Sequence, residues 1–149
     1  ITSETGGPVH WHADFEVWAC GKEIVPRSPE SILDNKVGTS ELHHHDDKRI
    51  HVEGILRTRS EASLGSFFTA IGGDLTGTAI ELDGKRFENG DTCNGKPAQL
   101  MMFVNGRINN DFNDYIISPY STVPPGDEIK IVFDERPQRE LNPRIGSPP

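Results

Sequence analysis

The segment HWHADFEVWACGKEIVP (residues 10–26) alternates apolar and polar side chains over most of its length. Successive side chains of a β-strand point to opposite faces of the sheet, so every second residue would share one apolar face. These residues are Trp11, Ala13, Phe15 and Val17. Gly21 and Lys22 follow, and glycine beside a polar residue is typical of a tight turn. The segment therefore predicts a β-hairpin with one face directed to a core.

Other parts of the chain show the same alternation, often followed by a turn signal. Such patterns lie in residues 41–56, 78–90, 98–110 and 127–135. The first of these predicts a second hairpin, which turns around residues 46–49. Asp83-Gly84 and Asn105-Gly106 are dipeptides that favour the tight turns of hairpins. A hairpin-rich β-sheet is therefore expected.

One segment, SEASLGSFFTAIGG (residues 60–73), has the periodicity of a helix. Its apolar residues recur on one side of a helix, and they are Leu64, Phe67, Phe68 and Ile71. Ser60 or Ser63 would cap its beginning, and Gly72-Gly73 would end it. The predicted fold class is mostly β with one helix, that is, α+β.

Composition excludes several classes of protein. The chain has 149 residues, a formal net charge of −8 and 34% hydrophobic residues, which suits one soluble domain with a core. Excess negative charge argues against nucleic acid or an anionic membrane as the main partner, because both attract clustered Lys and Arg. No apolar run approaches the ~20 residues that span a bilayer, so no membrane span is expected.

Both ends of the chain are polar. We expect residues 1–9 to form an N-terminal arm, residues 10–134 a single β-rich domain and residues 135–149 a proline-rich tail. The tail lacks an apolar pattern, so it is expected to be disordered unless a neighbouring copy orders it. Self-association through such arms could produce an extracellular homopolymer or filament. A chain that starts with Ile1 also looks like a mature form without its leader, which predicts an exported protein.

The two cysteines, Cys20 and Cys93, lie far apart in the sequence and beside turn-forming residues. An even number of cysteines suits one disulfide bond in an oxidising, extracytoplasmic compartment. Two free buried thiols are the alternative.

All six histidines lie in two short segments, and none follows His51. The apolar residues Leu42, Ile50 and Val52 need one common face, and alternation turns the residues between them to the other face. That face would carry His43, His45, His51 and Glu53, with His44 on the side of Leu42 or at the edge of the strand. Pairing of the two strands that keeps these faces needs a loop with an odd number of residues, or a four-residue loop with a bulge. The same argument groups His10, His12, Asp14 and Glu16 in the first hairpin.

Histidines grouped in this way indicate a metal site. Neutral imidazoles are available near pH 7, and Zn(II) and Cu(II) accept three or four of them. The predicted ligands of a copper or zinc ion are His10, His12, His43, His45 and His51. The carboxylates predicted to orient these imidazoles are Asp14, Glu16, Asp46 and Glu53.

Other interpretations of the histidines stay open. An exposed strand face or a solvated loop end can carry histidine without a metal, and a histidine cluster can act as a pH-sensitive contact. Residues 10–16 also fit the spacing of the first metal motif of cupins, although a cupin needs a later histidine.

The order of motifs along the chain resembles a largely uncharacterised group of small exported or membrane-anchored proteins of archaea and some bacteria. The motifs are His10-Trp11-His12, Leu42-His43-His44-His45-Asp46, Ile50-His51-Val52-Glu53, Leu64-Gly65-Ser66-Phe67-Phe68 and Val104-Asn105-Gly106. The match covers about residues 8–134, and it implies that His43 and His45, but not His44, are the recurring ligands. Separately, residues 101–133 look like the end of a β-grasp (ubiquitin-like) fold, in which a V-N-G strand pairs with a G-D-E-I strand.

These observations together predict an extracytoplasmic, histidine-rich domain that binds copper or zinc and is not an enzyme. The sequence has no G-x-S-x-G, C-x-x-C or glycine-rich phosphate loop before its helix. A filament subunit, with or without metal, and a metal-dependent enzyme are the alternatives.

Overall fold

The fold is that of a computed structural model. It describes the backbone of residues 8–25, 36–37, 39–43, 49–55, 59–117 and 126–149, and the side chains of residues 13–25, 60, 62–117 and 126–149. Most of the predicted N-terminal arm, and His44, His45 and Asp46, lie outside the described residues.

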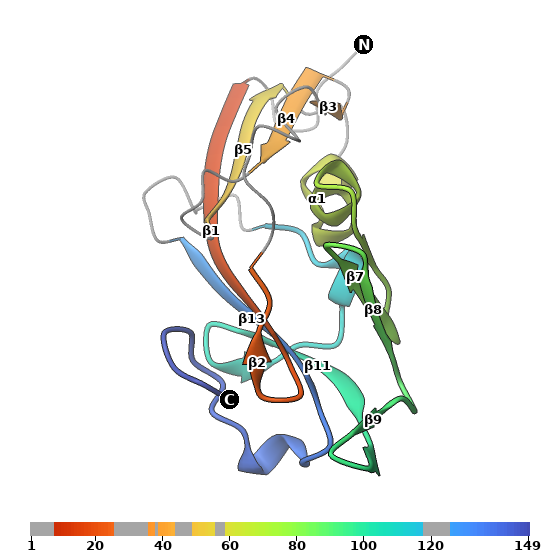
Figure 1. The fold of residues 1–149 in the computed structure, drawn as a ribbon. Helices are drawn as coiled ribbons and strands as arrows, with labels where there is room; N and C mark the ends of the chain where they lie inside the picture. The colour runs from red at the N-terminus through yellow and green to blue at the C-terminus, as the bar shows by residue number, and fades with distance from the viewer. Residues whose placement is uncertain (1–7, 26–35, 38, 44–48, 56–58, 118–125) are drawn as a thin grey trace.

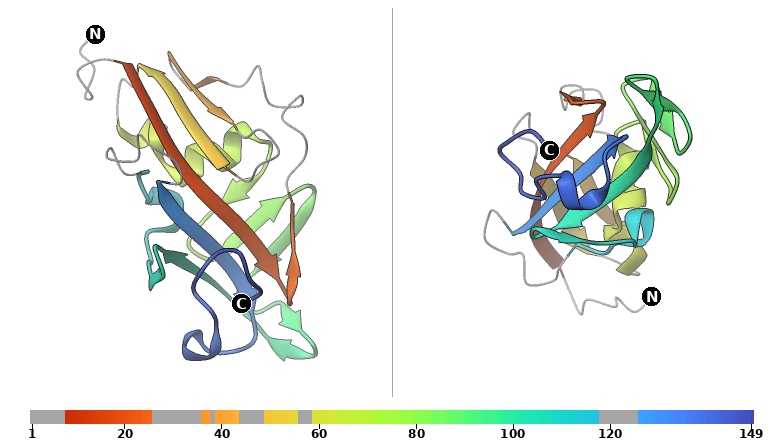
Figure 2. Two further views of the ribbon diagram at one scale, coloured as in Figure 1. Left: turned by 90° about the vertical axis from the view of Figure 1, so that its left-hand side faces the viewer. Right: turned by 90° about the horizontal axis from the view of Figure 1, so that it is seen from below.

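A mixed eight-stranded sheet forms the centre of the molecule (Figures 1 and 2). Its strands are β1 (Pro8–Ala19), β2 (Lys22–Glu23), β3 (Lys36–Val37), β4 (Thr39–His43), β5 (Arg49–Ile55), β11 (Gln99–Val104), β12 (Arg107–Ile108) and β13 (Asp127–Asp134). They lie in the order β12-β11-β13-β1-β5-β4-β3, and β2 pairs with the end of β1. The predicted mostly-β class with one helix is confirmed.

Smaller elements lie beside this sheet. Three strands, β6 (Asp74–Leu75), β7 (Ala79–Leu82) and β8 (Lys85–Glu88), form a second sheet, and β9 (Thr92–Cys93) pairs with β10 (Lys96–Pro97). The helices are η2 (Arg59–Ala62), α1 (Leu64–Ala70), η3 (Phe112–Asp114) and η4 (Gln138–Glu140). We call the face of the central sheet toward α1 and β7 the inner face, and the opposite face the outer face (Figure 1).

Strand β1 joins the two halves of the central sheet. Residues 8–14 pair antiparallel with β5, and residues 13–19 pair parallel with β13. In its described part the alternation is as predicted, because Ala13, Phe15 and Val17 are buried in the main core. Trp18 packs instead against a separate apolar cluster of the outer face, formed by Phe103, Val132 and Leu141 with Met101.

The helix begins where the sequence predicted. Ser63, not Ser60, is the N-cap, and its Oγ accepts a hydrogen bond of 3.1 Å from the backbone N–H of Ser66. The predicted apolar side chains pack into the core, with Ile71 partly buried. Gly72 has a φ of +82° just after the helix, a conformation that glycine adopts without strain.

Turns with two residues of positive φ close four hairpins of the described residues, and one of them is Asn94-Gly95 between β9 and β10. Asp83-Gly84 and Asn105-Gly106 are the predicted turns of β7–β8 and β11–β12. In the first hairpin the turn residues are Cys20 and Gly21, one position earlier than predicted, because Lys22 already pairs with Ala19.

Cys20 and Cys93 form the predicted disulfide bond, with their Cα atoms 5.2 Å apart. The bond ties the turn after β1 to β9, across 73 residues of sequence. Closing a loop of this length stabilises the fold by about 4 kcal/mol in the chain-entropy model.

The tail, residues 135–149, packs on the outer face of its own chain (Figure 2), so the expectation that it is disordered by itself is wrong. Self-association through the tail stays a prediction. Leu141 is buried against Phe103 and Val132. The Nζ of Lys130 donates hydrogen bonds to the backbone carbonyls of the tail, at 2.9 Å for Asn142, 2.6 Å for Arg144 and 2.8 Å for Ser147. Hydrogen bonds from a buried lysine of the sheet therefore hold the tail, which has no apolar pattern of its own.

Candidate functional site

The backbone register aligns three histidines across three neighbouring strands. His12 of β1 lies opposite His51 of β5, and His51 lies opposite His43 of β4. Both pairs of strands are antiparallel. We call these three positions the histidine row.

Next to the histidine row, in one direction along the strands, apolar and polar rows alternate. One step along the strands, Trp11, Val52 and Leu42 lie opposite one another. Two steps along, the opposed residues are His10, Glu53 and Glu41. An apolar row therefore alternates with polar rows, as expected for a sheet with one face toward a core.

The described end of β1 indicates which face each row belongs to. Phe15 and Val17 lie in the core of the inner face, and alternation gives the inner face to Trp11 and the outer face to His12. On the inner side, α1 contacts β4 (Figure 1). The histidine row therefore occupies outer-face positions of the backbone.

The predicted site residues are placed to different degrees. His10, His12, His43, His51 and Glu53 are described as strand positions only, without their side chains. His45 and Asp46 lie outside the described residues. Glu41 was not among the predicted site residues and lies opposite Glu53; alternation from His43 back along β4 gives Glu41 the same parity as His43. Within the side chains that the structure describes, no group of three or more His, Cys, Asp or Glu is placed to hold a metal.

Glu16, predicted to orient an imidazole, has other partners in the structure. Its Oε1 accepts a hydrogen bond of 3.0 Å from Nε1 of Trp18, and its Oε2 accepts one of 2.6 Å from the backbone N–H of Gly146 in the tail. A role of Glu16 toward a metal stays a prediction. The contact of Glu16 with Gly146 holds the tail.

Lys130 completes this contact with the tail. It lies opposite Glu16 in the register of β1 and β13, and its Nζ is 6.0 Å from the centre of the Trp18 ring. Burial lowers the pKa of Lys130 from its ordinary value, and the negative charge of Glu16 opposes that shift. We call Glu16, Trp18 and Lys130 the tail clamp.

Another buried polar contact lies at the beginning of β13. The hydroxyl of Tyr115 donates a 2.6 Å hydrogen bond to Oδ2 of Asp127, and Nδ2 of Asn105 lies 3.3 Å from Oδ1. Burial, followed by the bond to Asp127, raises the pKa of Tyr115 well above its ordinary value. The hydrogen bond from Tyr115 to Asp127 ties η3 to the sheet.

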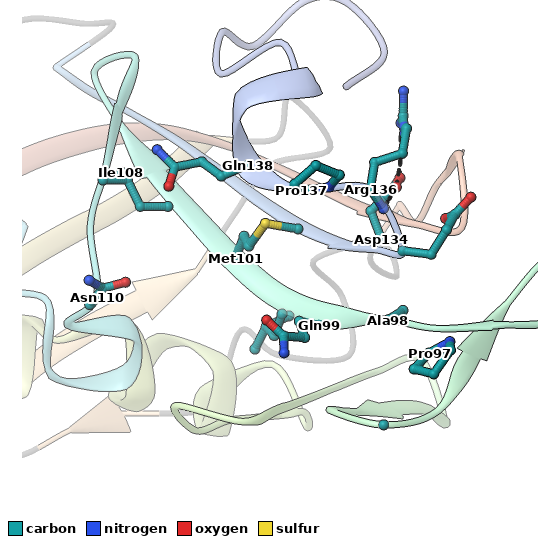
Figure 3. Close-up of a pocket in the computed structure, with 13 residues that line it drawn as sticks. Pro97, Ala98, Gln99, Met101, Ile108, Asn110, Asp134, Arg136, Pro137 and Gln138 are labelled. Atoms are coloured by element: carbon teal, nitrogen blue, oxygen red, sulfur yellow. Dashed lines mark hydrogen bonds and ion pairs between the residues drawn. The ribbon is translucent and has the colours of Figure 1, made fainter.

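A pocket of about 630 Å³ opens on the outer face beside the tail (Figure 3). Met101 of β11, Ile108 of β12 and Gln138 of η4 line it from three sides. The strands of the central sheet that line it are β11, β12 and β13, whereas the histidine row lies on β1, β5 and β4 of the same sheet. The pocket and the histidine row are therefore separate candidate sites.

Comparison of the chain with protein-family models, with curated proteins and with solved structures found no match. No helix in the described part of the chain is both long and apolar enough to cross a membrane. A function for this chain therefore rests on its own residues and geometry.

Proposed function

We propose that this protein is an extracytoplasmic, non-enzymatic domain that binds a copper or zinc ion through the histidine row, with His10 and His45 as further ligands. The observation that carries the proposal is the register of His12, His51 and His43. Directly opposed residues in an antiparallel pair have Cβ atoms about 4.5–5.5 Å apart and share a face. Three imidazoles on such positions lie within reach of one ion, to which each nitrogen binds at about 2.0–2.1 Å.

The neighbouring residues suit the same chemistry. Glu53 and Glu41, opposed two positions from the histidine row, are acceptors of the kind that fix the orientation of a metal-bound imidazole. Asp14, two positions from His12 on β1, has the same alternation parity. The disulfide bond supports a place outside the cytoplasm, because such bonds persist in oxidising compartments.

Elemental analysis of protein purified without added metal, followed by calorimetric titration with Zn(II) and Cu(II), tests the proposal. About one ion per chain is expected, and less than ~0.2 ion per chain after titration would contradict it. His51 has a histidine on both sides, so His51→Ala should weaken binding most, by at least about tenfold. His44→Ala is the matched control, because the parity argument excludes His44, and it should bind as the unaltered protein does.

Electron paramagnetic resonance of the Cu(II) form gives an independent readout. Nitrogen hyperfine coupling from three or more imidazoles is expected, and its loss in His51→Ala but not in His44→Ala would assign the ligands. A signal from oxygen ligands alone would exclude the histidine row as the site.

We also infer that the central strands have a β-grasp-like arrangement. The strand that ends in Val104 pairs antiparallel with β13, as the resemblance implied for the V-N-G and G-D-E-I strands. In addition, β1 is parallel to β13, and α1 lies against one face of the sheet (Figure 1). An experimental structure with another strand order would contradict this inference.

A further inference from the structure

The pocket beside the tail combines an apolar floor with an unusual exposed side chain. Met101 lies in its floor, and Pro137 of the tail forms part of one wall (Figure 3). Ile108, at the rim, is 39% exposed. Among the side chains that the structure describes, only Val25 and Ile108 are large hydrophobic groups that are exposed. An exposed apolar side chain at a concave surface is a feature of ligand and partner sites.

The polar part of the pocket is rich in carboxamides. Gln99 of β11, Asn110 after β12 and Gln138 of η4 reach the pocket from three different elements (Figure 3). No hydrogen bond joins their carboxamide groups to another residue in the part of the chain that the structure describes. Each carboxamide carries both donors and an acceptor, so the pocket offers both kinds of group at three points.

Two of the three charged residues of the pocket neutralise each other. Asp134 accepts hydrogen bonds of 2.9 Å from both Nε and Nη2 of Arg136, one on each carboxylate oxygen. Such a bidentate pair fixes both side chains and leaves little net charge for a ligand. Glu135, which also lines the pocket, accepts a 3.2 Å hydrogen bond from Nδ2 of Asn94. The lining therefore disfavours an anionic ligand, and its single uncompensated charge, Glu135, already accepts a hydrogen bond from a neutral amide.

The edge of β11 beside the pocket is already occupied by hydrogen bonds. The backbone N–H of Leu100 donates to Oδ1 of Asn89 at 2.7 Å, and the carbonyl of Met102 accepts from the backbone N–H of Asn109 at 2.9 Å. A peptide that adds a strand to a sheet needs such groups free. This occupancy disfavours an extended peptide as the ligand.

We propose that this pocket binds a neutral, hydroxyl-rich small molecule, a sugar residue. Sugar hydroxyls donate and accept hydrogen bonds at once, as the carboxamides of Gln99, Asn110 and Gln138 do. The C–H face of a sugar ring would pack on Met101 and Ile108. A purely apolar ligand would leave the carboxamides buried without partners, which disfavours binding. The pocket volume of about 630 Å³ is within the usual range of ligand sites.

Nuclear magnetic resonance titration of the ¹⁵N-labelled full chain tests the proposal. The probes are maltotriose and cellotriose, the capped peptide acetyl-Ala-Ile-Ala-amide, and glucuronate as a charged sugar. We expect saturable shifts of the side-chain amide signals of Gln99, Asn110 and Gln138 with at least one neutral trisaccharide, and weaker ones with glucuronate. Saturation by the peptide alone, or shifts that rise linearly with every probe, would overturn the proposal.

A pair of variants assigns the site. Gln99→Ala combined with Gln138→Ala removes two carboxamides of the pocket and should raise the dissociation constant for the trisaccharide about tenfold. Asn113→Ala removes a carboxamide outside the pocket lining and should leave the constant unchanged. Equal affinity of the double variant and the unaltered chain would exclude this pocket even if a sugar binds. Both side chains of the double variant are exposed, so its fold should be retained.

Discussion

Glu16 and Lys130 lie directly opposite each other in the parallel register of β1 and β13, and both are buried, with exposed fractions of 5% and 0%. Each uses its charge to hold the tail, Glu16 through the N–H of Gly146 and Lys130 through backbone carbonyls. The tail is therefore fixed by an anion that accepts and a cation that donates. Loss of either partner would leave the other charge buried without its compensation.

Lys130→Met is expected to lower the free energy of unfolding by about 3 kcal/mol. The change removes the donor of three hydrogen bonds to the tail and leaves Glu16 without the opposite charge. Urea unfolding measures the loss, and hydrogen exchange of the Gly146 amide measures detachment of the tail. Lys85→Met, at an exposed position, is the control and should change stability by less than about 0.5 kcal/mol. Equal stability of the two variants would show that the clamp does not hold the tail.

The Asp134–Arg136 pair predicts a loss of stability in acid. Burial by itself would raise the pKa of Asp134, but hydrogen bonds from the side chain and backbone of Arg136 outweigh it and hold the pKa below its ordinary value of 3.8. The contribution of Asp134 is therefore complete above pH 3.8 and disappears as pH falls through the lower pKa of the folded state. Asp134→Asn should be about 1–3 kcal/mol less stable at neutral pH, with a shallower decline in acid.

Denaturant unfolding between pH 2 and pH 7 checks this prediction. Asp74→Asn serves as the control, because that carboxylate is exposed and its closest ion-pair distance to Arg86 is 3.9 Å. An identical acid decline in Asp134→Asn and in the unaltered chain would refute the prediction.

The disulfide bond between Cys20 and Cys93 predicts the result of thiol labelling and a loss of stability when the bond is removed. Mass spectrometry of the unfolded, unreduced chain should show no alkylated thiol, and reduction should expose two. Replacing both Cys20 and Cys93 by Ser should cost about 4 kcal/mol in the free energy of unfolding, because the unfolded chain gains the freedom that the bond removed. Two labelled thiols before reduction would show that the bond is absent.

Gly73 is expected to tolerate no side chain. A Cβ atom there would clash with the backbone carbonyl oxygen of Glu81, so β6 and β7 would have to separate. Gly73→Ala should destabilise the fold by about 1–3 kcal/mol in thermal or urea unfolding. Gly77→Ala is the matched control, since nothing lies within 4 Å of its added methyl group. Comparable stability of the two variants would contradict the close approach.

The sequence predicted those parts of the fold that follow from neighbouring residues. The hairpin turns at Asp83-Gly84 and Asn105-Gly106 and the N-cap of the helix depend on a few residues in a row, and all three are confirmed. The turn at Cys20-Gly21 was displaced by one residue because the pairing of Lys22 with Ala19 set it.

Contacts between segments far apart in the sequence could not be predicted from local sequence patterns. The parallel pairing of β1 with β13 joins segments more than a hundred residues apart and has no signal in either strand. The order of the tail was missed because its acceptors are backbone carbonyls, which every residue has, and their common donor is Lys130.

The candidate site was predictable only in part. Alternation predicted which histidines share a parity, and the register then aligned His12, His51 and His43. The alternation of side chains could not predict that β4, β5 and β1 would be neighbours in one sheet. The pocket was not predicted, because Gln99, Asn110 and Gln138 meet there only after the tail has folded back.

The parallel alignment of β1 and β13 has a mechanical consequence. Because the strands run in the same direction, tension applied between the beginning of β1 and the end of β13 pulls them past each other along their length. The hydrogen bonds of a parallel pair are evenly spaced along the two strands, so a force along the strands loads all of them at once. The bonds between residues 13–19 and 127–133 would therefore carry the load together and fail together, where a pair peeled from one end would open bond by bond.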